Sequence, residues 1–181
     1  MSNMIKMRYK GKEYYYYKND WVGTDFVIVH DTLRRELEKQ FSSGRNLDDM
    51  TIDQLLQEGD RLKKNGSYPR AVGCFEKALS KCGERDGRPA EIYPRLTSCW
   101  RAQGFPEKAV DLFGQLIESR SFVLAWNPPL LTSVGAAFCD LDDWDMGRKC
   151  ADKAFSQSRK KASEELNNLY GRIYRHYGYE Q

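Results

Sequence analysis

Four aspartates within six residues form the densest group of potential metal ligands in the chain. Asp140, Asp142, Asp143 and Asp145 offer the oxygen ligands that calcium prefers. A calcium loop of the EF-hand kind also needs a glycine at its sixth place and a glutamate at its twelfth, and this segment has neither. The spacing therefore predicts a turn between two helices, in which an aspartate caps the second helix.

No other set of residues is arranged for catalysis, metal binding or phosphate binding. The two histidines, His30 and His176, stand near opposite ends of the sequence, and neither has partners at a spacing typical of metal ligands. Gly11, Gly23 and Gly44 are isolated, so no glycine-rich loop is present to cradle a phosphate. We therefore expect a protein that is not an enzyme and that needs neither a cofactor nor a metal.

Aromatic and basic residues are interleaved near the N-terminus. The tyrosine run 14–17 and Trp21 lie among Lys10, Lys12 and Lys18, and aromatic rings between cations can stack on nucleic-acid bases. Short strands, however, need a surface on which to pack their aromatic side chains. We therefore favour packing against the first helical repeat or a second subunit over nucleic-acid binding. The net charge of +3 is small, and the sequence contains no block of like charges.

The larger part of the chain is organised by a repeat with a period of 38 residues. The recurring positions are Leu55, Gly59, Leu62, Ala71, Phe75 and Ala78; then Tyr93, Thr97, Trp100, Ala109, Phe113 and Leu116; then Leu131, Gly135, Phe138, Gly147, Ala151 and Ala154. In such a helix–turn–helix repeat, small residues let two helices approach closely and large ones fill the space between hairpins.

This pattern resembles the tetratricopeptide repeat (TPR) family over residues 51–157. The resemblance is specific because three units agree in phase. The family period is about 34 residues, so each unit here is about one helical turn longer, and we place the surplus in residues 83–89 and 121–129. The first unit also departs from the family by carrying Glu58 at an apolar position. The resemblance implies a scaffold that binds other proteins.

In the family, the first helix of each unit lines a concave groove. The corresponding positions, which we predict to be partner-binding residues, hold Asp60, Lys63, Lys64, Arg95, Ser98, Arg101, Ser133 and Asp140. Relatives that clamp a peptide's terminal carboxylate need a lysine and, four residues later, an asparagine, whereas this chain has Leu56 and Asp60 there. The mixed charges favour a charged, polar protein segment as ligand. The alternative is that these are ordinary solvated helix faces.

The expected fold is mostly α-helical, a TPR-like solenoid with a small N-terminal antiparallel β meander. The meander and one helix occupy residues 1–46, with the third strand at 26–29 and the helix beginning at Asp31. The repeat domain is 47–181, with units at about 51–84, 90–122 and 128–157 and a capping helix at 162–177.

Two packing expectations follow from the phase of the repeat. Trp100 should be buried between its own hairpin and the preceding one. The capping helix should pack on the third unit through the stripe Leu166, Leu169, Tyr170 and Ile173, facing Phe138, Ala151, Ala154 and Phe155, with Asn167, Arg172 and Arg175 outside. The competing interpretation is that this stripe forms a dimer.

The remaining predictions concern the cellular compartment and the class of function. Five cysteines without a CxxC pair fit reduced thiols in a cytoplasmic protein. The N-terminus lacks a signal-peptide core, and no apolar run is long enough to span a membrane. We expect a cytoplasmic adaptor that binds a protein or peptide. The alternatives are a regulator that contacts nucleic acid through the β meander, or a secretion-type chaperone, a class that is usually helical throughout.

Overall fold

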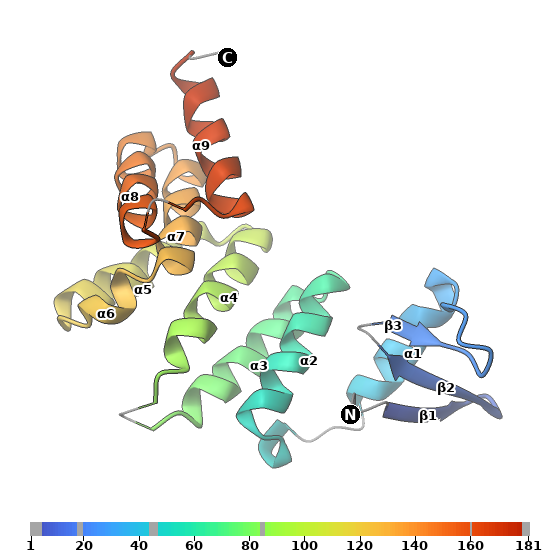
Figure 1. Cartoon of the computed structure of the whole chain (residues 1–181). Coiled ribbons are helices and arrows are strands. Elements are labelled where there is room, and N and C mark those ends of the chain that lie inside the picture. Colours follow the sequence, from blue (N-terminus) through green and yellow to red (C-terminus); the bar gives the residue numbers. More distant parts are fainter. Residues whose placement is uncertain (1–4, 18–19, 44–46, 84–85, 160, 179–181) are drawn as a thin grey trace. The chain divides into compact units, whose positions relative to one another are not determined.

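A computed structural model describes residues 5–17, 20–43, 47–83, 86–159 and 161–178. The chain forms two compact units that divide between Asp49 and Met50. It is mostly helical, with a small antiparallel sheet near the N-terminus, as expected (Figure 1). None of the helices in the described ranges is long and apolar enough to cross a membrane.

The N-terminal unit packs a helix on one face of a small sheet. Its elements are β1 (Ile5–Tyr9), β2 (Lys12–Tyr17), β3 (Asp20–Val22), α1 (Asp31–Ser43) and the short 3-10 helix η1 (Leu47–Asp49). The strands are antiparallel in the order β1-β2-β3. Since side chains alternate between the faces of a strand, Met7, Tyr14 and Tyr16 share one face and pack with the buried Trp21 and Leu37.

The third strand lies earlier than the sequence predicted. It is Asp20–Val22, whereas the predicted strand 26–29 contributes only one bridge, between Val22 and Ile28. The cause is a tight turn after Gly23, in which the N–H of Phe26 donates to the carbonyl oxygen of Gly23 at 3.1 Å. Phe26 adopts φ +60° there, so the chain is redirected before a regular ladder can form.

The second unit consists of helical hairpins that follow one another along the chain (Figure 1). Its helices are α2 (Ile52–Lys64), α3 (Tyr68–Ser80), α4 (Pro89–Ala102), α5 (Pro106–Glu118), α6 (Phe122–Ala125), α7 (Pro128–Asp140), α8 (Trp144–Gln157) and α9 (Glu164–His176). The hairpins are α2/α3, α4/α5 and α7/α8. The short helix α6 lies in the predicted surplus 121–129, so part of the extra length forms its own helical turn.

The same turn closes all three hairpins. The residue after the C-cap is left-handed in each case, with φ +74° at Gly66, +80° at Gly104 and +62° at Asp142. The following N–H groups donate to carbonyls five residues back, Ser67 to Leu62, Phe105 to Trp100 and Asp143 to Phe138, each at 2.9 Å. Glycine and aspartate are among the residues that tolerate this conformation. The 38-residue period is therefore a repeat of backbone geometry as well as of side-chain size.

Small residues bring the paired helices into contact, as the repeat pattern predicted. Ala71 and Ala109 are fully buried. A Cβ atom built on Gly59 of α2 would lie 2.4 Å from Cε1 of Phe75 in α3, so the aromatic ring occupies the space that a side chain would need. In the third hairpin, a Cβ on Gly147 would lie 3.0 Å from the carbonyl oxygen of Gly135. Because glycine carries only a hydrogen atom in place of a side chain, the two helices can approach closely at these positions.

The prediction that Trp100 is buried needs correction, and the structure shows how Glu58 is accommodated. Trp100 is only half-buried, whereas Leu62 at the same position of the first unit is buried. An indole is larger than a leucine side chain, and tryptophan often keeps an exposed part. Glu58, which departs from the family pattern, is buried together with Arg61, whose Nε donates to Oε2 of Glu58 at 2.8 Å.

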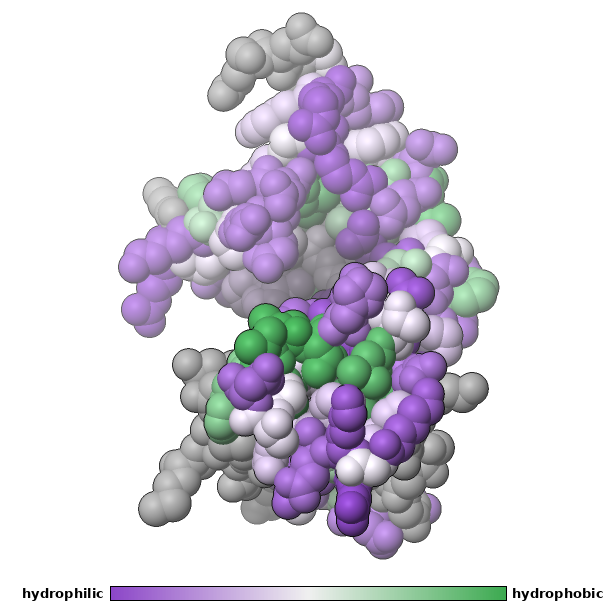
Figure 2. Space-filling view, turned by 90° about the vertical axis from the view of Figure 1, so that its right-hand side faces the viewer, coloured by the Kyte–Doolittle hydropathy of each residue, from purple (hydrophilic) through white to green (hydrophobic). Residues whose placement is uncertain are grey.

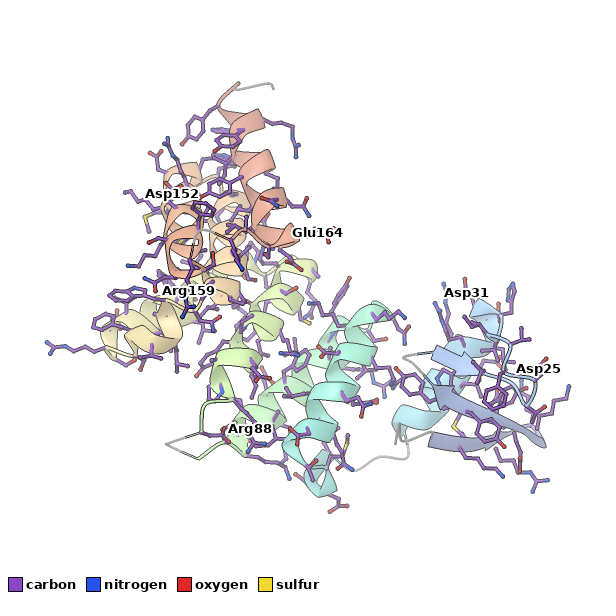
Figure 3. All side chains as sticks on the ribbon, viewed as in Figure 1. Asp25, Asp31, Arg88, Asp152, Arg159 and Glu164 are labelled. Atoms are coloured by element: carbon purple, nitrogen blue, oxygen red, sulfur yellow. The ribbon has the colours of Figure 1, made fainter. Side chains whose placement is uncertain are left out.

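The last helix, α9, packs on the third hairpin through the predicted stripe. Leu166, Leu169 and Ile173 are buried in one cluster with Ala151 and Ala154. The hydroxyl of Tyr170 donates to Oδ1 of Asp152 in α8 at 2.8 Å. Asp152 is labelled in Figure 3. The prediction is wrong for Arg172, which does not project outward: its Nη2 donates to Oδ1 of Asp140 in α7 at 2.7 Å.

The cysteines provide a test of this packing. Cys74, Cys99, Cys139 and Cys150 are buried thiols that form no disulfide, and Cys82 is half-buried. Burial raises the pKa of the Cys150 thiol to about 12, so almost no thiolate forms at neutral pH. We expect a thiol-specific reagent to modify Cys82 first in the native protein and all of the cysteines after unfolding. Mass spectrometry of partially labelled protein measures the order, and early labelling of Cys150 would contradict it.

Candidate functional site

A groove of about 540 Å³ runs across the first helices of the three hairpins. Its lining residues come from α2, α4, α7, the segment that leads into α9 and the first turn of α9. They are Lys63, Pro94, Arg95, Ser98, Arg101, Pro128, Pro129, Thr132, Ser133, Ala136, Ser158, Lys161, Ser163, Glu165 and Leu166. Several are related by the repeat, since Lys63 and Arg101, Arg95 and Ser133, and Ser98 and Ala136 are each 38 residues apart. Ligand sites of this size are common in proteins.

The groove lining is predominantly basic. Lys63, Arg95, Arg101 and Lys161 contribute four cations, whereas Glu165 contributes the one carboxylate among the lining residues. Neither lysine has a carboxylate within ion-pair distance in the described part of the chain. Prolines and small residues form the apolar part of the walls. The surface therefore favours an anionic ligand with modest side-chain volume.

The two arginines are held by carboxylates at the border of the groove. Nε of Arg95 donates to Oδ1 of Asp60 at 3.0 Å, and its Nη1 donates to the carbonyl of Glu91 at 2.8 Å. These contacts join α2 to α4 and restrict the guanidinium group of Arg95. A restricted cation loses less side-chain entropy when it binds a ligand.

Asp140 holds two guanidinium groups at once. Its Oδ2 accepts from Nε of Arg101 in α4 at 2.7 Å, and its Oδ1 accepts from Nη2 of Arg172 in α9 at 2.7 Å. This carboxylate therefore connects three helices, α4, α7 and α9. Asp140 also lines a second, more open depression with Ser98, Arg101 and Pro106. The arrangement links the position of α9 to the basic side of the groove.

The structure brings most of the predicted partner-binding residues together. Lys63, Arg95, Ser98, Arg101 and Ser133 line the groove. Asp60 and Asp140 lie at its border through the ion pairs just described. Lys64 is exposed and is not among the lining residues, because one further helical step turns it away from Lys63.

The repeat pattern did not predict one wall of the groove. Ser158, Lys161 and Ser163 belong to the connection between the last hairpin and the capping helix, and Glu165 lies in the first turn of α9; neither segment is a groove element of the resembled family. Pro94 and Thr132 were also missed; they lie one residue before Arg95 and Ser133, which were identified.

The aspartate cluster has structural partners, as predicted for a turn. Asp143 caps α8 by accepting from the N–H of Met146 at 3.0 Å. Asp140 contacts the two arginines, and Asp145 accepts from the hydroxyl of Tyr177 at 2.7 Å. Within the described ranges, no group of three or more His, Cys, Asp or Glu residues is placed to hold a metal ion.

The aromatic residues of the N-terminal unit are mostly occupied by its own core. Trp21 and Tyr16 are buried, and they pack on Leu37 and Leu33 of α1. The hydroxyl of Tyr9 donates to Glu36 at 2.8 Å. These rings pack on the helix of their own unit, a partner that the sequence analysis did not consider, and they do not form an open platform for bases.

Comparison with known proteins found solved structures of similar fold. A solved structure described as "MamA AMB-1 C2221" matches with a TM-score of 0.49 and 15% sequence identity, over 80% of this chain and 79% of that chain. No protein-family model matches the sequence, and no curated protein is similar to it. The resemblance to TPR proteins therefore rests on the repeat positions and the hairpin geometry of the chain itself.

Proposed function

We propose that this protein is a TPR-like interaction scaffold that binds an acidic, extended segment of a partner protein in the groove. The observation that carries the proposal is the charge of the groove lining, four cations against one carboxylate. The proposed role is binding without catalysis. We place it in the cytoplasm, where free thiols such as those of this chain stay reduced.

Lys63 and Lys161 are the main candidates for recognising the partner's carboxylates. They approach the groove from opposite borders, α2 and the segment before α9, and no described carboxylate neutralises either of them. An acidic segment that spans the groove can place one carboxylate at each lysine without displacing an internal ion pair. Arg95 and Arg101, already oriented by Asp60 and Asp140, add donors at fixed positions.

The rest of the lining is suited to a main chain with small side chains. Pro94, Pro128 and Pro129 offer apolar surface, and none of the three has a backbone N–H to leave unpaired. The hydroxyl of Ser98 makes no hydrogen bond to another described residue, so it is available to a partner. Such walls contact an extended segment without demanding one particular large side chain.

A charge-reversal experiment tests the groove. Lys63→Glu/Lys161→Glu should weaken binding of a short fluorescent glutamate-rich peptide by about tenfold or more, which corresponds to about 1.4 kcal/mol. Fluorescence anisotropy measures the affinity, which should also fall as ionic strength rises. The matched control is Lys64→Glu/Lys149→Glu, which makes the same change in net charge at exposed positions outside the groove.

The control variant and a second peptide show whether binding depends on the groove and on the charge of the ligand. Equal loss of affinity in the groove variant and the control would show that binding depends on net charge and not on the groove. Equal affinity for a lysine-rich peptide would show that the ligand is not selected by charge. Either result would overturn the proposal.

A further inference from the structure

Asp140 stands outside the repeat pattern of the three hairpins. The equivalent positions of the earlier hairpins hold Ala102 and Lys64. Asp140 is also the last residue of α7, where the helix dipole disfavours a negative charge. The hairpin fold therefore does not require a carboxylate here, and its role lies with the two guanidinium groups that it binds, those of Arg101 and Arg172.

The cluster around Asp140 carries more positive than negative charge. Arg101 and Arg172 each donate to it at 2.7 Å, and within the described ranges no other carboxylate lies within ion-pair distance of either arginine. Two cations against one carboxylate leave an excess of one positive charge. The side chains of Arg101, Arg172 and Asp140 are 23%, 34% and 26% exposed, so solvent screens this charge less than it screens a fully exposed ion pair.

The other arginine of the groove has a different charge balance. Arg95 pairs with Asp60, at 3.0 Å from Nε to Oδ1, and in the described part of the chain no second cation forms an ion pair with that carboxylate. One cation against one carboxylate leaves no excess charge. A ligand carboxylate must compete with an undivided carboxylate at Arg95, but with a shared one at Arg101. The two arginines therefore differ as ligand-binding groups, although both line the groove.

The guanidinium group of Arg101 still has donors to offer. Only its Nε is used by Asp140, and its Nη groups make no hydrogen bond to another described residue. An arginine carries five N–H donors in all. Arg101 and Ser98 line both the groove and the second, more open depression. A ligand carboxylate can therefore contact Arg101 while Asp140 remains bound to Arg172.

Arg172 is held in place from outside the groove, whose lining does not include it. Its guanidinium carbon lies 6.0 Å from the centroid of the Trp144 ring, a cation–π contact. The same ring stacks on His176, with centroids 4.1 Å apart. The helix α9 is itself fixed by its buried apolar stripe. Packing at the end of the repeat unit therefore maintains the contact between Arg172 and Asp140.

We infer that Arg172 is a positioning residue for the groove: by holding Asp140, it leaves the charge of Arg101 available to an acidic ligand. The inference rests on the proposed function of the groove. Without Arg172, the whole charge of the carboxylate would act on Arg101, and a ligand would have to displace a complete ion pair. Without Asp140, Arg101 would present its full charge. The two changes should therefore shift the affinity in opposite directions, which a general loosening of the groove cannot do.

Fluorescence anisotropy of the full chain with the glutamate-rich peptide tests the inference. Arg172→Leu should weaken binding about threefold and Asp140→Asn should strengthen it about threefold, the size expected for partly exposed ion pairs. Matched controls make the same changes in charge at exposed positions nearby. They are Arg175→Leu on α9, whose exposed side belongs to the mostly hydrophilic upper part of Figure 2, and Asp142→Asn in the turn after α7. Both controls should bind like the wild type.

Combining the two substitutions separates positioning from stability. In the Asp140→Asn background, Arg172→Leu should no longer weaken binding, because the carboxylate through which it acts is absent. Arg172→Lys keeps a cation beside Asp140 and should recover part of the affinity that Arg172→Leu loses. An equal loss from Arg172→Leu with and without Asp140, or behaviour of either variant like its control, would overturn the inference.

A second measurement separates this inference from the proposed function. Exchange of the Arg101 Nε proton with water, followed by NMR on the free protein, reports its hydrogen bond to Asp140. It should slow about threefold in Arg172→Leu but not in Arg175→Leu. If the wild-type protein bound no acidic peptide, the proposed function would fail, while slower exchange would still support control of Arg101 by Arg172. Unchanged exchange would refute that control, whatever the peptide does.

Discussion

Replacing Gly59 by alanine is expected to lower the free energy of unfolding of the repeat unit by about 3 kcal/mol, at the upper end of the usual range for overpacking. The added Cβ would lie 2.4, 2.7 and 2.8 Å from three ring atoms of Phe75. Phe75 is fully buried, so its ring has little room to move. The helices α2 and α3 must separate, or the ring must leave its position. Thermal and urea unfolding measure the effect.

Two other glycines provide matched controls for this substitution. Gly73 in α3 and Gly114 in α5 also lie within helices, but a Cβ at either position would meet nothing within 4 Å. Alanine is favoured over glycine in a helix by about 1 kcal/mol, so Gly73→Ala and Gly114→Ala should stabilise the protein. If Gly59→Ala were also stabilising, the close approach of α2 and α3 would be wrong. Reducing the ring in Gly59→Ala/Phe75→Leu should recover part of the loss.

The repeat positions explain why much of the fold could be predicted. Gly59, Ala71 and Phe75 are constrained by contact between two helices. The same contact occurs in each hairpin, so side chains of similar size recur at the period of the repeat. Gly66 and Gly104 mark the turns for the same reason, since a left-handed residue ends the first helix of each hairpin. The groove positions follow from the same periodicity, because residues 38 apart on equivalent helices lie along one surface.

The features that the sequence did not predict depend on contacts between segments that the 38-residue repeat does not relate. The strand expected at residues 26–29 has the right composition, but the hydrogen bond between Phe26 and Gly23 ends the ladder. Arg172 occupies a helix position that a stripe analysis assigns to the outside, and it reaches Asp140 only because its side chain is long. Lys161 lies in a connection outside the repeat. Each depends on tertiary geometry and not on local pattern.

The helix α9 has two roles that its sequence alone did not connect. Its apolar stripe covers the third hairpin, and its first residues, together with Ser158 and Lys161 before it, form one wall of the groove. Arg172 then fixes Asp140, which also holds Arg101 on the basic side. A change in α9 is therefore expected to affect stability and peptide binding together, whereas Lys63→Glu should affect binding alone.

Ending the chain after Lys161 is expected to have the largest effect of all. The truncation removes Leu166, Leu169 and Ile173, which are buried in the cluster that covers Ala151 and Ala154. Those surfaces would meet water at the end of the stack, where repeat proteins need a polar outer face. We expect aggregation and loss of cooperative unfolding, measured by size-exclusion chromatography and circular dichroism.

Point substitutions separate the capping role of α9 from the competing one, a dimer interface. Leu169→Ala removes a buried side chain and should lower the free energy of unfolding by about 3 kcal/mol in a monomer. Asn167→Ala, at an exposed position of the same helix, should change it by less than about 0.5 kcal/mol. A capping helix predicts this difference at every protein concentration, because the buried contacts are within one chain. If α9 instead joined two chains, the truncated protein would be a soluble, folded monomer, and the effect of Leu169→Ala would vary with concentration.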